Sequence, residues 1–184
     1  WRFINPLMKA QYGVDAMPQT ADNVADDYHI SRADQDAFAL RSQQRTAAAQ
    51  AAGYFAEEIV PVRVAHKKGE TIVEHDEHPR ADTTLETLSK LKPVNGPDKT
   101  VTAGNASGVN DGSAALILAS ADAVNRHGLT ARARVLGMAS AAVAPRVMGI
   151  GPVPAVRKLV ERLGLAVSDF DVIELNEAFA SQGL

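Results

Sequence analysis

The chain has 184 residues and no cysteine, with 19 Lys and Arg against 22 Asp and Glu and 46% hydrophobic residues. The net charge of −3 offers no electrostatic attraction for nucleic acid or an anionic membrane surface. The lack of cysteine excludes a disulfide framework, a thiolate metal site and a cysteine nucleophile within these residues. No apolar run reaches the ~20 residues that span a bilayer, so a cytoplasmic location is expected, and the abrupt ends suggest a piece of a longer protein.

The first fifty residues predict two helices after an irregular start. Residues 1–18 contain turn signals and are expected to be irregular. A short helix is expected over 20–28 with Thr20 as its N-cap. Ser31 to Asp34 resembles a capping box, so a longer helix should start there and end at Gly53, with a small alanine face packed against a neighbour.

A strand and then a charged stretch follow. Residues 58–64 are β-branched and predict a strand, which Pro61 restricts to a sheet edge. Residues 66–82 are dominated by charge and predict an exposed excursion, with a hairpin as one form of it. His75 and His78 stand among carboxylates, but no apolar scaffold or spaced partner ligand accompanies them. A solvent-exposed loop is therefore favoured over a metal site.

The rest of the chain alternates between strand-like and helical patterns. Small or β-branched runs at 100–105, 133–142 and 171–175 predict strands, and the run 114–120 fits a buried strand or a buried helix. This alternation indicates an α/β protein. Helices are expected over 84–90, over 120–127 with Gly128 after it, and over 152–163 with Gly164 after it.

Three motifs can carry chemistry, and each also has a plain structural explanation. The spacing around Ser107 in the turn 104–108 fits neither a nucleophile elbow nor a P-loop, which leaves a tight turn or a loop where a polar ligand approaches the backbone. The Gly149-x-Gly151 pair precedes a proline, which indicates a helix start and not a dinucleotide site. Asn176 either opens a helix or presents an amide that orients a water or a carbonyl.

Taken together, the motifs resemble the thiolase family in their order and spacing. The opening segment Trp1–Lys9 is similar to the members of that family that act on 3-oxoadipyl-CoA in aromatic catabolism. The resemblance implies an α/β protein with the layered αβαβα thiolase fold, incomplete in this chain. It covers essentially the whole chain through the segments Met17–Ala25, Thr102–Gly112, Val147–Ala155 and Glu174–Ala180.

The resemblance also implies a reaction. Thiolases cleave a 3-ketoacyl-CoA with CoA, through an acyl-cysteine intermediate, to acetyl-CoA and a shortened acyl-CoA. CoA is a substrate, and no cofactor or metal is implied. The two cysteines and the histidine of the family fall outside this chain, so we expect these 184 residues alone to be inactive. Ala16 stands where acetoacetyl-type thiolases carry histidine, which favours a degradative enzyme.

Matching positions supply the site residues that the family implies. Asn176 corresponds to the asparagine that holds an oxyanion-hole water. The implied substrate and CoA contacts are Ser107 and Ala106 at the pantetheine arm, Phe179 near the reacting centre, Met17 in the acyl pocket, and Arg80 and Thr87 near the CoA nucleotide.

The resemblance divides the chain into two parts. Residues 1–127 would hold the covering loops and the end of the first thiolase domain, and 128–184 the start of the second. The intact protein is expected to be a homodimer or homotetramer that binds acyl-CoA and CoA, with no nucleic acid or membrane partner. The alternatives are a non-catalytic CoA or lipid carrier of the same fold, a condensing enzyme, or a structural domain. Asn176 favours the catalytic branch, since condensing enzymes usually carry histidine there.

Overall fold

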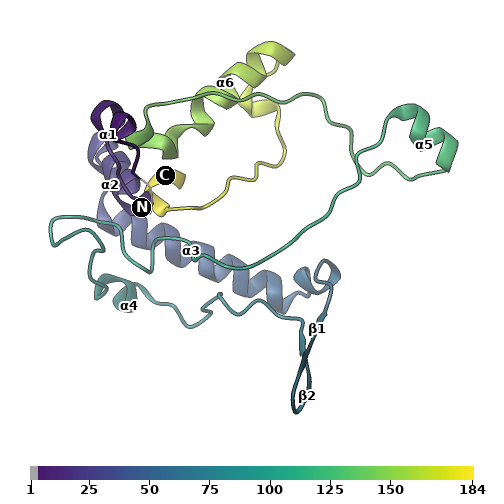
Figure 1. Cartoon of the computed structure of the whole chain (residues 1–184), viewed down its shortest axis with the longest axis horizontal. Helices are drawn as coiled ribbons and strands as arrows, with labels where there is room; N and C mark the ends of the chain where they lie inside the picture. Colours follow the sequence, from purple (N-terminus) through teal and green to yellow (C-terminus); the bar gives the residue numbers. More distant parts are fainter. Residues whose placement is uncertain (1–3) are drawn as a thin grey trace.

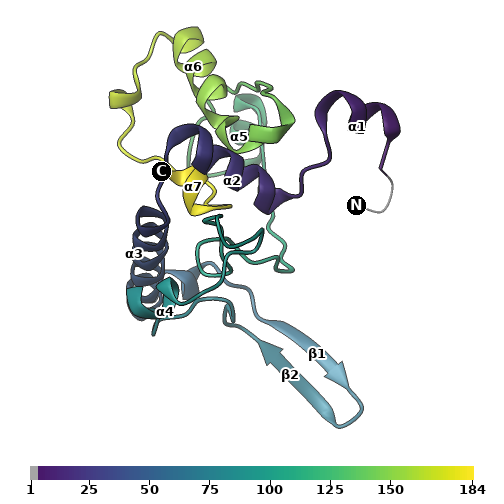
Figure 2. The same ribbon diagram turned by 90° about the vertical axis from the view of Figure 1, so that its left-hand side faces the viewer.

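The computed structural model describes residues 4–184 and consists of helices joined by long segments without regular structure (Figure 1). A two-stranded hairpin projects from the body, and the first helix stands apart from it (Figure 2). The elements are α1 (Pro6–Tyr12), α2 (Met17–Tyr28), α3 (Arg32–Ala51), η1 (Phe55–Glu57), β1 (Val62–His66), β2 (Gly69–Val73), α4 (Leu85–Ser89), α5 (Ala121–His127), η2 (Pro145–Ile150), α6 (Pro152–Leu163), η3 (Val167–Asp169) and α7 (Ala180–Gly183).

Helix α1 was expected to be irregular, and that prediction is wrong for the described residues. The Asn5 side chain accepts hydrogen bonds from the amides of Leu7 (2.9 Å) and Met8 (3.3 Å), while Pro6 occupies the first turn. An Asn-Pro pair marks a turn, but it equally marks an N-cap followed by a first-turn proline. Residues 1–3, which begin the segment that resembles the 3-oxoadipyl-CoA enzymes, lie outside the described residues.

Helix α2 begins three residues earlier than expected, at Met17. Pro18 in the first turn does not block the helix, because the amide it lacks has no intrahelical partner there. The Gln19 side chain accepts from the amide of Ala16 at 2.7 Å. Thr20 is not the N-cap: its hydroxyl donates to the Met17 carbonyl at 2.7 Å.

The predicted starts of α3, α4 and α5 and the predicted ends of α5 and α6 are confirmed. Ser31, Thr84 and Ser120 each accept a hydrogen bond from a first-turn amide at the starts of α3, α4 and α5. Gly128 and Gly164 end α5 and α6 with φ of 59° and 64°. Glycine takes this left-handed conformation without a Cβ clash, so each helix ends where its glycine stands.

Helix α3 buries a different face from the one expected. The predicted alanine face is largely exposed, and the buried residues are Gln35, Asp36 and Ala39. The pattern of apolar residues predicts the wrong face, because neighbouring segments supply hydrogen-bond partners that allow Gln35 and Asp36 to be buried. Arg32 also donates from Nη2 to the carbonyls of Leu88 (2.7 Å) and Leu91 (3.0 Å), which holds the end of α4 against α3.

The end of the expected strand and the start of the charged stretch together form the hairpin β1–β2, in register from Val62 opposite Val73 to His66 opposite Gly69. The expected strand over 58–64 is thus displaced toward the C-terminus, because the chain pairs only after Pro61. Both strands are exposed along their whole length, as the charge had indicated.

Several other segments expected as strands are not strands in this structure. Residues 100–105 include a turn, and 114–120, 133–142 and 171–175 are extended without a strand partner among the described residues. Ile117, at the centre of its apolar run, is 90% exposed. A strand satisfies its backbone amides and carbonyls only through a neighbour, so the strand predictions for these segments are wrong in this chain.

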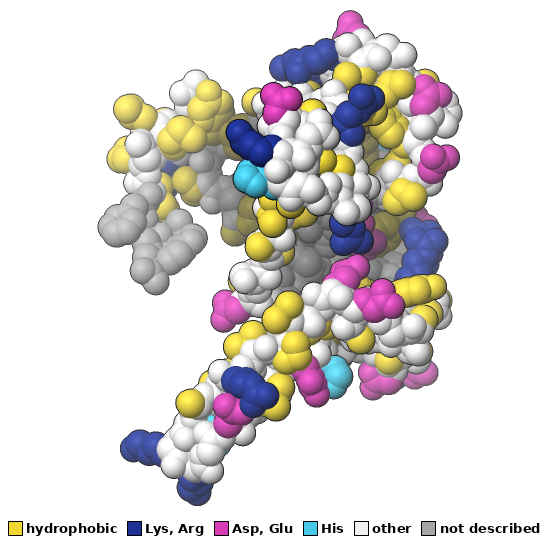
Figure 3. All heavy atoms as spheres, turned by 90° about the vertical axis from the view of Figure 1, so that its right-hand side faces the viewer, with side chains coloured by type: hydrophobic (Ala, Val, Ile, Leu, Met, Phe, Trp, Pro, Cys, Tyr) yellow, Lys and Arg dark blue, Asp and Glu magenta, His cyan; other side chains and the backbone are white. Residues whose placement is uncertain are grey.

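We refer to residues 109–120, 129–144 and 170–177 as the extended segments. Almost all of their residues are exposed, and Figure 3 shows hydrophobic side chains at the surface of the face that carries α5 and the hairpin. Within residues 4–184, no helix has both the length and the apolar character that crossing a bilayer requires.

We refer to α2, α3, α4, α7 and residues 94–108 as the helical unit, which holds most of the buried side chains. Helix α2 packs against η2 and α7, and α3 packs against α4 and α7. The Ser181 hydroxyl donates to the Ala21 carbonyl at 3.0 Å and ties α7 to α2. The buried apolar residues of the unit are Ala21, Val24, Ala25, Ala39, Leu88, Val101 and Ala180.

Candidate functional site

Two loops far apart in sequence meet at one end of the helical unit. We call residues 104–108 the serine loop and residues 176–179 the asparagine loop. The amide of Ser107 donates to the Ala178 carbonyl at 3.0 Å, and the amide of Ala180 donates to the Asn105 carbonyl at 2.9 Å. These bonds form an antiparallel bridge between Ala106 and Phe179.

Asn105 holds the base of the serine loop. It is 3% exposed, and its side-chain oxygen accepts from the amide of Thr102 at 2.7 Å. Its side-chain nitrogen donates to the Thr100 carbonyl at 3.0 Å and to Oδ1 of Asp36 at 3.1 Å. Because both donor hydrogens and the acceptor are used, the Asn105 side chain has one defined orientation.

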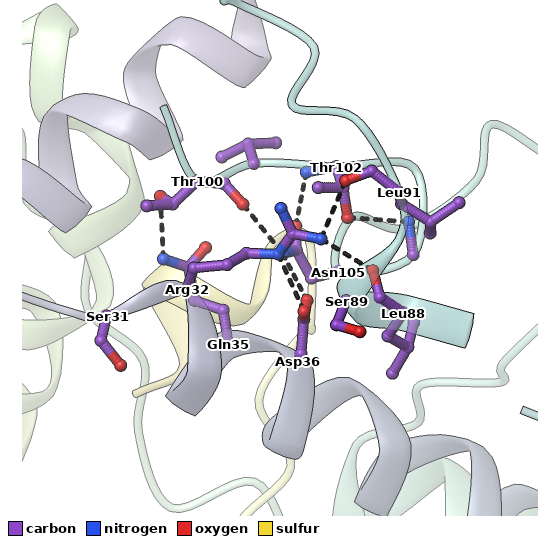
Figure 4. A network of polar contacts seen from close by, with 12 residues as sticks. Ser31, Arg32, Gln35, Asp36, Leu88, Ser89, Leu91, Thr100, Thr102 and Asn105 are labelled. Atoms are coloured by element: carbon purple, nitrogen blue, oxygen red, sulfur yellow. Dashed lines mark hydrogen bonds and ion pairs between the residues drawn. The ribbon is translucent and has the colours of Figure 1, made fainter. Parts of the chain in front are cut away.

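The Asp36 carboxylate lies beneath this loop on α3. Its Oδ2 accepts from Nε of Arg32 at 2.8 Å, and it is 4% exposed. Figure 4 shows Arg32 and Asp36 reaching from α3 toward the segment that carries Thr100 to Asn105. A buried carboxylate is tolerated when a cation and hydrogen-bond donors surround it, and both conditions are met here.

A second buried carboxylate, Asp22 of α2, holds the same segment further upstream. It accepts from the amides of Thr100 and Val101, each at 3.0 Å, and from the Thr100 hydroxyl at 3.2 Å. Asn95 donates to its other oxygen at 2.7 Å. Two carboxylates from two helices thus fix the chain that leads into the serine loop.

An open hollow of about 210 Å³ lies between α3 and the two loops. Ser42 and Thr46 of α3 line it together with Ser107, Asn110 and Glu177. The Ser42 hydroxyl donates a hydrogen bond to the Glu177 carboxylate. The hollow thus presents both polar and apolar side chains, and its walls come from α3 and both loops.

The loops hold four of the seven site residues expected from the sequence. Ser107 and Ala106 lie on the serine loop, and Asn176 and Phe179 lie on the asparagine loop. Ser107 and Asn176 are both exposed. The prediction that Asn176 opens a helix is wrong, since α7 begins at Ala180 and Phe179 precedes it.

The other three expected residues stand on separate elements. Met17 is the exposed first residue of α2. The backbone amide of Arg80 donates to the Gln43 side chain of α3 at 2.7 Å. Thr87 is used within α4, where its hydroxyl accepts from the amide of Thr84 at 3.1 Å. None of Met17, Arg80 and Thr87 lines the hollow beside Ser107.

The charge–charge contacts that shift a pKa lie away from the two loops. The hydrogen bond from Arg146 lowers the pKa of the Asp27 carboxyl, and this pair joins α2 to η2 at 2.6 Å. The hydrogen bond to Asp26 raises the pKa of the Lys99 ammonium. The loops themselves present backbone groups, hydroxyl and amide side chains, and the carboxylate of Glu177.

The motif with His75 and His78 forms no metal centre in the described part of the chain. No three His, Cys, Asp or Glu side chains of residues 4–184 are placed to hold a metal ion. The His78 ring instead lies against Gly108, where a Cβ would collide with it. A glycine at position 108 is therefore needed for the His78 ring to pack this closely against the backbone.

Comparison with known proteins assigns the family. The model of the thiolase N-terminal domain matches residues 4–122, and that of the thiolase C-terminal domain matches residues 129–184. The chain belongs to the thiolase family. It is 87% identical over 184 residues to the beta-ketoadipyl-CoA thiolase of Pseudomonas putida, covering 100% of this chain and 46% of that protein. The chain thus spans less than half the length of this relative.

Solved structures agree with this assignment. The crystal structure of the Bacillus anthracis acetyl-CoA acetyltransferase matches with a TM-score of 0.88 at 47% identity, over 91% of this chain and 42% of that one. Human mitochondrial 3-ketoacyl-CoA thiolase in complex with CoA matches with a TM-score of 0.85 at 50% identity, over 91% and 41%. The predicted family and the incomplete α/β thiolase fold are confirmed.

The residues that support the two loops were not predicted from the sequence. Asp22, Asp36 and Ser42 lie on helices and read there as ordinary polar positions, and Asn105 reads as a turn residue. Their partners stand far along the chain, as with Asp36 and Asn105. No local pattern distinguishes Asp36 from the exposed polar residues of α3, such as Asp34 and Gln44.

Proposed function

We propose that this chain is the central part of an acyltransferase that cleaves a 3-ketoacyl-CoA with CoA. The observation that carries the proposal is the bridge between the serine loop and the asparagine loop. It places Ser107, proposed to bind the pantetheine arm, beside the loop of Asn176, proposed to hold the oxyanion-hole water. Both are polar groups at the surface, as a substrate contact requires.

In this proposal the chain supplies binding and charge stabilisation. Hydrogen-bond donors aimed at a developing oxyanion lower the barrier because they need no reorganisation during the reaction. The Asn176 amide would orient a water toward the thioester oxygen, and Phe179 would pack near the reacting carbon. The thiolate that carries the acyl group must come from outside these residues, since the chain has no cysteine.

We propose 3-oxoadipyl-CoA as the substrate. Support comes from the 87% identity to a protein named beta-ketoadipyl-CoA thiolase. Met17 would line the acyl pocket, and Arg80 and Thr87 would lie near the CoA nucleotide. Of these two, Arg80 is better suited, because the Thr87 hydroxyl is already used in the cap of α4.

Thiolysis by the full-length protein that contains this chain tests the proposal. We expect faster cleavage of 3-oxoadipyl-CoA than of acetoacetyl-CoA, and no cleavage by the 184-residue chain alone. Asn176→Ala should lower kcat by about 100-fold, the scale of losing one oxyanion-hole donor. Asn125→Ala, at an exposed position of α5, is the control and should change nothing. Binding of CoA without cleavage would instead support the non-catalytic carrier.

The remaining proposals concern organisation. The match to the N-terminal domain ends at residue 122, and the match to the C-terminal domain begins at residue 129. This supports a division of the chain near residues 127 and 128. We propose a homodimer or homotetramer for the intact protein, to be checked by sedimentation, and a cytoplasmic location, to be checked by cell fractionation.

A further inference from the structure

The two loops carry the proposed site, yet neither belongs to a sheet in this chain. Each consists of a few residues, and their direct link is a single bridge. A water-holding amide and a pantetheine-binding hydroxyl must keep a defined separation to act on one substrate. Some rigid element therefore has to set where each loop lies.

Helix α3 contacts both loops and is the longest helix among the described residues, with 20 residues. Asp36 accepts from the Asn105 side chain at the base of the serine loop, at 3.1 Å. Less than two turns later, Ser42 donates to Glu177, the residue next to Asn176. The Phe38 ring lies between these positions and packs against Gly183 of α7, where a Cβ would be 2.7 Å from the ring.

We propose that Asp36 and Ser42 are positioning residues, through which α3 sets the Ser107 loop and the Asn176 loop at their working separation. Neither side chain is proposed to touch substrate. Asp36 acts through Asn105, and Ser42 acts through Glu177. The inference rests on the proposed thiolase function and adds residues to it that the family resemblance had not indicated.

The first test is Ser42→Ala in the full-length protein. The partly exposed hydroxyl fills little space, so the melting temperature should stay within about 2 °C of wild type. We expect kcat to fall about tenfold with the KM for CoA within a factor of about two, because a small shift of Asn176 affects the transition state more than binding. Ser42→Thr keeps the hydroxyl and should restore kcat.

Gln44→Ala is the matched control for this variant. Gln44 lies two residues further along α3, is exposed and does not line the hollow, and no hydrogen bond joins it to the asparagine loop in the described part of the chain. It should leave kcat unchanged. Wild-type kcat in Ser42→Ala, or an equal loss in Gln44→Ala, would overturn the proposal.

The second test compares two buried carboxylates. Asp36→Asn leaves one acceptor oxygen where Arg32 and Asn105 each use one oxygen of the carboxylate, which weakens the hold on the serine loop. Asp22→Asn makes the same change for residues 95–101. Both should lower the melting temperature. Only Asp36→Asn should raise the KM for CoA, by about tenfold, in the protein that remains folded. Equal KM values in the two variants would overturn the role of Asp36. If Asp36→Asn does not fold, the comparison of Ser42→Ala with Gln44→Ala decides alone.

The activity of the wild-type protein distinguishes a failure of this inference from a failure of the proposed function. If it cleaves no 3-ketoacyl-CoA, the proposed function fails. If it is active and Ser42→Ala is equally active, the function stands and the positioning role of α3 is wrong.

Discussion

The helical unit buries carboxylates and amides, whereas the extended segments leave isoleucine and leucine in solvent. Asp22 is 2% exposed and Ile117 is 90% exposed, the reverse of what their side chains favour. The difference lies in the backbone. The Asp22 carboxylate accepts hydrogen bonds from the backbone amides of Thr100 and Val101. The apolar run around Ile117 has no strand beside it among the described residues.

This comparison shows that hydrogen-bond satisfaction decides what can be buried. An apolar strand cannot enter a core until a neighbour accepts its amides and donates to its carbonyls. The high TM-scores against longer thiolases indicate that the extended segments follow the path of that fold without the pairing. Unpaired extended chain is also a template for association, so we expect the 184-residue chain to self-associate.

The largest expected effect is in hydrogen exchange of the 184-residue chain. The amides of Thr100 and Val101 bond to a buried carboxylate and should exchange at least ~1000-fold more slowly than those of Ile117 and Leu118. Mass spectrometry of peptides from each region measures this ratio. Similar rates in both regions would remove the contrast between the helical unit and the extended segments.

The second prediction compares one substitution in each region. Asp22→Ala leaves buried amides without an acceptor and should cost about 3 kcal/mol of unfolding free energy. Ile117→Ala removes a larger apolar group but should cost under about 0.5 kcal/mol, because that side chain is already in solvent. Urea denaturation followed by helical circular dichroism gives both values. A larger cost for Ile117→Ala would mean that the run is buried in solution.

A smaller effect is expected at the end of α6. Gly164 has a φ of 64°, so Gly164→Ala places a Cβ in the left-handed region and should cost about 1 kcal/mol. Gly112→Ala, in an extended segment with open space around the new Cβ, is the control and should be neutral. Thermal unfolding of the two variants compares them, and equal midpoints would contradict the capping role of Gly164.

The smallest effect concerns acid. The hydrogen bond from Arg146 lowers the pKa of Asp27, so the stability from this pair is present above the unfolded pKa of ~3.9. It is lost as the pH falls below that value through the lowered folded pKa. Asp27→Asn should flatten this part of the profile of stability against pH, whereas Asp82→Asn, at an exposed position, should not. Identical profiles for wild type and Asp27→Asn would show that the pair contributes nothing.

The sequence by itself determined the local features of this protein and its family. Helix starts at Ser31, Thr84 and Ser120 and helix ends at Gly128 and Gly164 followed from side-chain and φ preferences that act within one turn. The family followed from the order and spacing of four motifs, which is a property of the chain alone. Ser107 and Asn176 lie within those motifs.

Only the tertiary structure determined which segments form strands and which residues hold the two loops in place. The runs 114–120, 133–142 and 171–175 have strand composition, but a strand exists only with a neighbour at hydrogen-bond distance, and composition does not supply one. The hydrogen bond between Asp36 and Asn105 joins a residue of α3 to a loop residue far along the chain, so no local sequence pattern predicts it. A buried carboxylate is stable only where its donors converge, and folding alone brings them together.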